Sequence, residues 1–126
     1  MRKRVSIARV LALDPDVMLM DEPFGSLDAM TRSLMQEFLL EIWESKKKTV
    51  LFVTHDINEA IFLADKVYIM TARPGRIKAV LDVNLERPRK LEMQSTPAFY
   101  TLRDQALSMI HEEAKKAMIQ KEEEVS

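Results

Sequence analysis

Two adjacent carboxylates are the residues of this sequence best suited to chemistry. Asp21 and Glu22 follow the apolar residues 17–20, and Pro23 comes directly after them. A short apolar run that includes valine suits a buried strand, which the proline ends. At the end of such a strand, Asp21 can hold Mg²⁺ on a phosphate and Glu22 can polarise a water molecule. The alternative is an apolar strand followed by a solvated acidic turn.

A histidine follows a second apolar run. His55 comes after residues 49–54, whose β-branched and apolar composition predicts a strand buried on both faces. The C-terminal ends of parallel strands meet at one edge of a sheet, where open α/β sheets bind ligands. We therefore expect Asp21, Glu22 and His55 to converge. A lone histidine is more often structural, but one that shares an edge with an acidic pair favours a functional site.

The elements that position these residues alternate along the first half of the chain. We expect a third strand over residues 66–70 and three helices: residues 3–13, ended by Asp14-Pro15; residues 29–46, capped by Asp28; and residues 57–64, capped by Asp56. The second helix has an apolar stripe of Met30, Leu34, Phe38 and Ile42, widened by Leu27, Leu39 and Trp43. This order predicts an α/β fold, in which crossover helices join parallel strands.

The second half of the chain predicts a hairpin and a helix. Residues 73–76 have proline and then glycine at their centre, which suits a type II turn, and residues 77–85 would return as an antiparallel strand. Residues 86–90 are predicted to be a linker. A last helix begins at about residue 96 and has one apolar face, made of Phe99, Leu102, Ala106, Met109 and Ile110. The charged residues 112–124 are expected to fray.

Composition limits the class of protein. The 126 residues are 47% hydrophobic and carry a net charge of -1, so no overall basic field favours nucleic acid. No cysteine is present, which rules out a disulfide framework and a thiolate metal site. No run approaches the roughly 18 apolar residues of a membrane span. We therefore expect a cytoplasmic chain that does not insert into the membrane.

Three ordered motifs resemble those of the ATPase subunits of ABC transporters. Residues 17–22 are similar to the Walker B strand, residues 24–28 to the D-loop and residues 53–56 to the switch-histidine loop. Residues 2–9 are similar to the helix that follows the ABC signature sequence. The resemblance implies the C-terminal half of a RecA-like P-loop NTPase domain over residues 1–86, with a linker and helical tail over 87–126. That tail, with Arg87-Pro88-Arg89 and Ser95 to Phe99, is similar to the nitrate/sulfonate/taurine importer subfamily.

The resemblance implies a role for each motif residue. Asp21 would hold Mg²⁺ through water, Glu22 would be the general base, and His55 would hydrogen-bond the γ-phosphate of ATP. Ser26 and Asp28 would lie at the interface between two ATPase subunits, although an ordinary capped turn is the alternative for them. The implied partners are transmembrane permease subunits and a second copy of the ATPase. The implied location is the cytoplasmic face of the membrane.

One part of the family pattern is not found in this sequence. Its only glycines are Gly25 and Gly75, and neither belongs to the phosphate-binding motif G-x-x-x-x-G-K-[ST]. The family places a strand between those that match residues 49–54 and 66–70, and this strand is also missing. We therefore expect the chain alone to be inactive, with unpaired inner strands, and Met1 to be internal to a longer polypeptide. A non-catalytic fragment that binds an ABC ATPase or its membrane partner is the alternative, as is a split enzyme.

Overall fold

The computed structural model of the protein describes residue 7, residues 9–10 and residues 12–125. Residues 7, 9, 10 and 12 are helical, and the chain leaves the helical conformation before Pro15, as the sequence predicts. Residue 13 forms a turn, and residues 3–6, 8 and 11 of the predicted helix over residues 3–13 lie outside the described residues, as does most of the segment that resembles the helix after the ABC signature.

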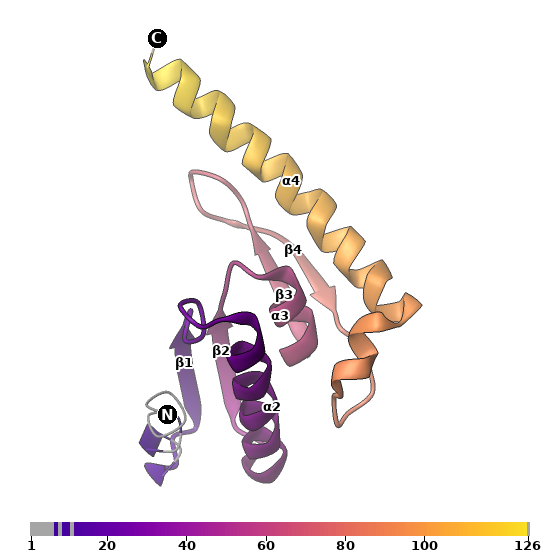
Figure 1. Ribbon diagram of the computed structural model, residues 1–126. Helices are drawn as coiled ribbons and strands as arrows, with labels where there is room; N and C mark the ends of the chain where they lie inside the picture. Colours follow the sequence, from indigo (N-terminus) through magenta and orange to yellow (C-terminus); the bar gives the residue numbers. More distant parts are fainter. Residues whose placement is uncertain (1–6, 8, 11, 126) are drawn as a thin grey trace.

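The strands form two separate pairs (Figure 1). β1 (Val17–Asp21) runs parallel to β2 (Thr49–Val53), and β3 (Lys66–Met70) runs antiparallel to β4 (Ile77–Asp82). The α/β class, the parallel pair and the hairpin are thus confirmed. A single sheet that continues from β2 to β3 is not formed by the described residues, which agrees with the expectation that a strand is missing between them.

Helices occupy the predicted places. α2 (Ala29–Lys46) connects β1 to β2, and α3 (Ile57–Leu63) connects β2 to β3. Both predicted caps are confirmed, since Asp28 accepts from the Thr31 N–H at 2.8 Å and Asp56 accepts from the Glu59 N–H at 3.1 Å. A short 3₁₀ helix, η1 (Leu91–Ser95), which the sequence did not predict, precedes the long α4 (Pro97–Val125).

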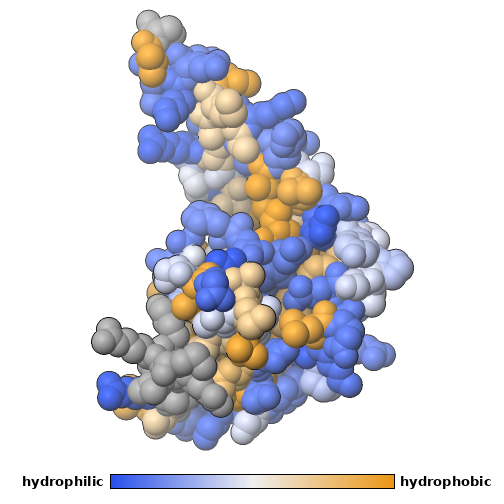
Figure 2. Space-filling view, in the orientation of Figure 1, coloured by the Kyte–Doolittle hydropathy of each residue, from blue (hydrophilic) through white to orange (hydrophobic). Residues whose placement is uncertain are grey.

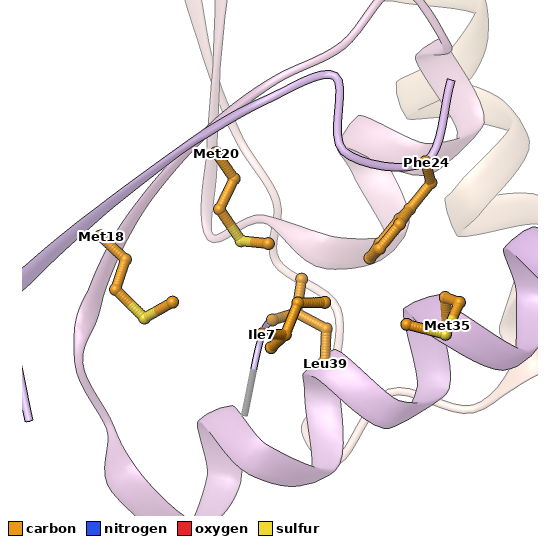
Figure 3. Close-up of a cluster of buried hydrophobic side chains, with 6 residues drawn as sticks. All are labelled: Ile7, Met18, Met20, Phe24, Met35 and Leu39. Atoms are coloured by element: carbon orange, nitrogen blue, oxygen red, sulfur yellow. The ribbon is translucent and has the colours of Figure 1, made fainter. Parts of the chain in front are cut away.

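The buried face of α2 differs from the predicted stripe. Met30 and Leu34 are 77% and 53% exposed, whereas Met35, Gln36, Leu39 and Leu40 are buried. The cause is that α2 has two neighbours. Met35 and Leu39 belong to one core cluster with side chains of β1 and of the loop that follows it (Figure 3). Leu40 belongs to a second cluster with residues of α3 and α4. The buried residues of α2 are therefore shared between these two clusters.

The parallel strand pair is covered on one face only. Met18 and Met20 point towards α2 and join Ile7 and Phe24 in one core cluster (Figure 3). Residues of the opposite face remain exposed, to between 43% and 70%: Val17, Leu19, Leu51 and Val53. The prediction that these strands are buried on both faces is therefore wrong for this structure, because strand residues alternate between faces and the described chain packs against just one of them.

The C-terminal helix is longer than expected. α4 runs unbroken to Val125 and projects beyond the rest of the chain (Figure 1). The surface of its projecting end is mostly hydrophilic in Figure 2. The prediction of fraying over residues 112–124 is wrong. Glu113 is buried against the β3–β4 hairpin, where it accepts from the Ala72 N–H at 2.7 Å and pairs with Lys78 at 3.1 Å.

The hairpin loop is not the predicted type II turn. That turn needs a positive φ at Gly75, and neither glycine of the chain has one. A side chain shapes the loop instead. The Thr71 hydroxyl donates to the Pro74 carbonyl at 2.8 Å and accepts from the Arg76 N–H at 2.9 Å.

The segment predicted to be a linker packs against the end of α3. Arg89 is 7% exposed, and its guanidinium donates to the carbonyls of Ile61 and Phe62 at 3.1 and 3.2 Å. Arg87 donates to the Leu63 carbonyl at 2.9 Å. Burial lowers the pKa of Arg89 to about 10. These bonds satisfy carbonyls that a helix end leaves without internal partners.

Candidate functional site

The ends of β1 and β2 bring together two of the residues singled out in the sequence. Glu22 directly follows β1, and its backbone N–H donates to the Val53 carbonyl at 2.7 Å, which continues the parallel ladder. His55 comes two residues after the end of β2. The His55 Nε2 lies 2.5 Å from a Glu22 carboxylate oxygen. The parallel register of these strands is therefore what places the acid beside the imidazole.

Both groups of this pair are open to solvent. The His55 side chain is 94% exposed and that of Glu22 is 39% exposed. Glu22 also has a φ of 45°, in the left-handed region that residues other than glycine, asparagine and aspartate seldom adopt. Such a conformation costs of order 1–3 kcal/mol and is found most often at functional sites. The backbone turn at Glu22 redirects the chain from β1 into the following loop.

Asp21 is the last residue of β1 and pairs in register with Val53. It is exposed, and its carboxylate makes no hydrogen bond or ion pair with a described residue. Within the described ranges, no three histidine, cysteine or carboxylate side chains gather into a metal-binding cluster. One free carboxylate fits Mg²⁺, which is commonly held by one or two carboxylates together with water and substrate phosphates.

The loop after Glu22 is anchored by a buried aromatic side chain. Phe24 is fully buried, and its ring centroid lies 5.7 Å from that of Phe52 on β2. Ser26, farther along the loop, is exposed. Asp28 is exposed too, but both of its oxygens accept hydrogen bonds from Thr31, which lower the pKa of Asp28. Asp28 thus acts as a helix cap, and a role at a subunit interface stays a prediction for Ser26 and Asp28.

Sequence reasoning missed Arg32 in this region. Its side chain, on the first turns of α2, pairs with Asp56 at 3.0 Å and reaches back to the loop after β1. The signal in the sequence is weak, because a charged residue on an amphipathic helix is usually solvated. That Arg32 bridges two loops depends on how α2 lies beside α3, and this is a tertiary feature.

No helix of the described residues is both long enough and apolar enough to cross a membrane.

Comparisons with known proteins agree with the motifs. The chain is 48% identical over 118 residues to an uncharacterised ABC transporter ATP-binding protein of Methanocaldococcus jannaschii, covering 94% of this chain and 43% of the relative. It is 55% identical over 107 residues to the aliphatic sulfonates import ATP-binding protein SsuB of Bacillus thuringiensis, covering 85% of this chain and 41% of the relative. No family model matches the chain. It spans less than half the length of these curated relatives, which agrees with a resemblance to one portion of the ATPase subunit. By sequence, the relatives of this chain are ABC transporter ATP-binding proteins.

Proposed function

We propose that this chain is part of an ATP-hydrolysing subunit of an ABC importer, the C-terminal half of a RecA-like P-loop NTPase domain. The observation that carries the proposal is the pairing of His55 with Glu22 at 2.5 Å, beside the free carboxylate of Asp21, at the ends of two parallel strands. This edge is where α/β sheets bind ligands.

Each residue has a distinct task in this proposal. Asp21 would hold Mg²⁺, and bound Mg²⁺ would supply neutralising positive charge at the phosphate oxygens. Glu22 orients the attacking water and accepts its proton. His55 hydrogen-bonds the γ-phosphate once its Nε2 has separated from the Glu22 carboxylate, and so stabilises the charge that develops there. Because both side chains are exposed, a phosphate and a water molecule can approach them from solvent.

The complete site needs groups that these 126 residues do not supply. The sequence contains no G-x-x-x-x-G-K-[ST] segment, and the relatives are more than twice as long as the matched region. We therefore expect the chain alone to bind Mg-ATP negligibly and to be inactive. In the complete subunit, Ser26 and Asp28 would face a second copy, and permease subunits would bind the dimer at the cytoplasmic face of the membrane. The name of the SsuB relative favours a sulfonate as cargo.

A chimera tests the assigned base. The chain replaces the 107 matched residues of the B. thuringiensis SsuB protein, and ATP turnover and ATP binding are measured separately. Glu22→Gln should lower turnover by about 10²–10⁴-fold, since the carboxylate is the general base. It should leave the dissociation constant of ATP within about twofold, because glutamine keeps the shape of the side chain. Glu41→Gln, at an exposed position of α2, is the matched control.

Near-normal turnover by Glu22→Gln, with Glu41→Gln also normal, would overturn the proposal. Weakened ATP binding with unchanged turnover per bound ATP would overturn the role of base, because it would make Glu22 a binding residue instead.

A second candidate function follows from the uncovered face of the parallel strands. A chain that leaves Val17, Leu19, Leu51 and Val53 exposed is suited to binding an ABC ATPase or its membrane partner without catalysing hydrolysis. The intact mass of the native polypeptide, captured with an antibody against residues 112–125, separates the two functions. A species much heavier than 14.6 kDa supports the ATPase, whereas a species of 14.6 kDa supports the binding fragment.

A further inference from the structure

We infer that Arg32 is a positioning residue that ties the loop after β1 to the loop after β2 and so fixes where His55 stands relative to Ser26. This inference rests on the proposed function, because it matters for activity only if His55 acts on a phosphate.

One guanidinium spans the two loops. The Arg32 Nη1 donates to a carboxylate oxygen of Asp56 at 3.0 Å. Its Nη2 faces the other loop, where the Leu27 and Gly25 carbonyls accept at 3.3 and 3.4 Å. These carbonyls flank Ser26 on both sides, and Asp56 directly follows His55. The hydrogen bonds of Arg32 therefore go to the neighbours of both residues.

Asp56 transmits this constraint to the histidine. Its second carboxylate oxygen accepts from the Glu59 N–H at 3.1 Å, and its own N–H donates to the Thr54 hydroxyl at 3.0 Å. The residues on either side of His55 are thus held by hydrogen bonds. The imidazole itself is almost fully exposed and contacts only Glu22 among the ion pairs of the described chain. Its position accordingly depends on the backbone that Asp56 and Arg32 hold in place.

The partial burial of this pair favours a defined geometry. The side chains of Arg32 and Asp56 are 28% and 35% exposed, so solvent screens their attraction less than it screens a pair on the open surface. A guanidinium presents its donors in a rigid planar fork, which can bond acceptors on two sides at once. The ammonium of lysine is a single point charge, so Arg32→Lys keeps the charge and cannot span the same three acceptors.

The test uses the chimera described above, with Arg32→Lys, Asp56→Asn and the double variant. We expect kcat to fall about tenfold to hundredfold in each single variant, since misplacement of a group by about 1 Å has effects of that size. The KM for ATP should stay within about twofold, and the double variant should lose no more than either single variant, because both break the same connection. Arg76→Lys is the control, since that exposed guanidinium makes no hydrogen bond with a described residue.

A structural readout accompanies the kinetics. Hydrogen exchange of the backbone amides should rise in both loops of Arg32→Lys, over residues 25–28 and 54–57, and stay unchanged in Arg76→Lys. Normal kcat in Arg32→Lys, additive losses in the double variant, or faster exchange in just one loop would each overturn the inference.

Glu22→Gln, measured in parallel, keeps the two hypotheses apart. If Glu22→Gln is inactive while Arg32→Lys turns over normally, the proposed function stands and Arg32 does not position the site. If Glu22→Gln turns over normally, the proposed function fails, and hydrogen exchange alone then decides whether Arg32 couples the two loops.

Discussion

Two methionines of α2 provide a direct test of which face of that helix is buried. Met35 is 1% exposed and Met30 is 77% exposed, although the apolar periodicity of the sequence favours Met30 for the buried stripe. Alanine replaces the same residue type in the same helix in both variants, so their helix propensities cancel. The difference between the two variants therefore reports burial alone.

The expected magnitude follows from the surroundings of Met35. Burying a methionine side chain contributes about 1.5–3 kcal/mol, and the cavity left by truncation raises the cost of Met→Ala in a core to about 2–5 kcal/mol. Met18 and Met20, in the same cluster, are flexible enough to fill part of that cavity. We therefore expect Met35→Ala to lower the free energy of unfolding by about 3 kcal/mol. Met30→Ala should change it by no more than about 0.5 kcal/mol.

Urea denaturation of the 126-residue chain measures both values. For an m-value of about 2 kcal/mol/M, a loss of about 3 kcal/mol lowers the midpoint by about 1.5 M. Circular dichroism and the fluorescence of Trp43 should give the same transition, which checks two-state unfolding. The reasoning would be refuted if Met30→Ala lowered the midpoint as much as Met35→Ala at an unchanged m-value.

Two further predictions concern the C-terminal part of the chain. The hydrogen bond from the Ala72 N–H is the largest cause that lowers the pKa of Glu113, from 4.5 to about 2. The stability that this carboxylate contributes is thus fully present above pH 4.5 and is lost as the pH falls towards about 2. At neutral pH the wild type should have a higher melting temperature than Glu113→Gln, and this difference should disappear as the pH falls through this range. A difference in melting temperature that stays constant with pH would contradict the role of Glu113. Arg89→Met leaves buried carbonyls at the end of α3 unpaired and should cost about 2 kcal/mol in urea denaturation. The exposed Lys90→Met should cost no more than about 0.5 kcal/mol, and equal losses would disprove the role of Arg89.

Features that depend on neighbouring residues in the chain could be predicted from sequence. The bounds of α2 and the caps Asp28 and Asp56 agree with expectation, because a cap bonds to a backbone N–H just three residues away. The rule that the C-terminal ends of parallel strands meet at one edge of a sheet also held for the candidate site. Glu22 and His55 meet because parallel strands end at the same edge, whatever the rest of the sheet does.

Features that depend on which elements become neighbours could not be predicted. Glu113 illustrates this, since it is one acidic residue among many in a charged stretch. It is buried because the hairpin presents the Ala72 N–H and Lys78 at that point of α4. No local pattern records that contact, so the stretch looked like a fraying end.

The sequence by itself predicted the relatives of this protein, its α/β class and the residues that meet at the ends of β1 and β2. These conclusions rest on motif spacing and on the chain's own periodicity, which are local properties. Tertiary structure alone decided which side of α2 is buried, that Glu113 is buried against the β3–β4 hairpin, and that Arg32 bridges the loops on either side of the site. Those features arise where separate elements pack together, and packing depends on the partners of a residue as much as on its type.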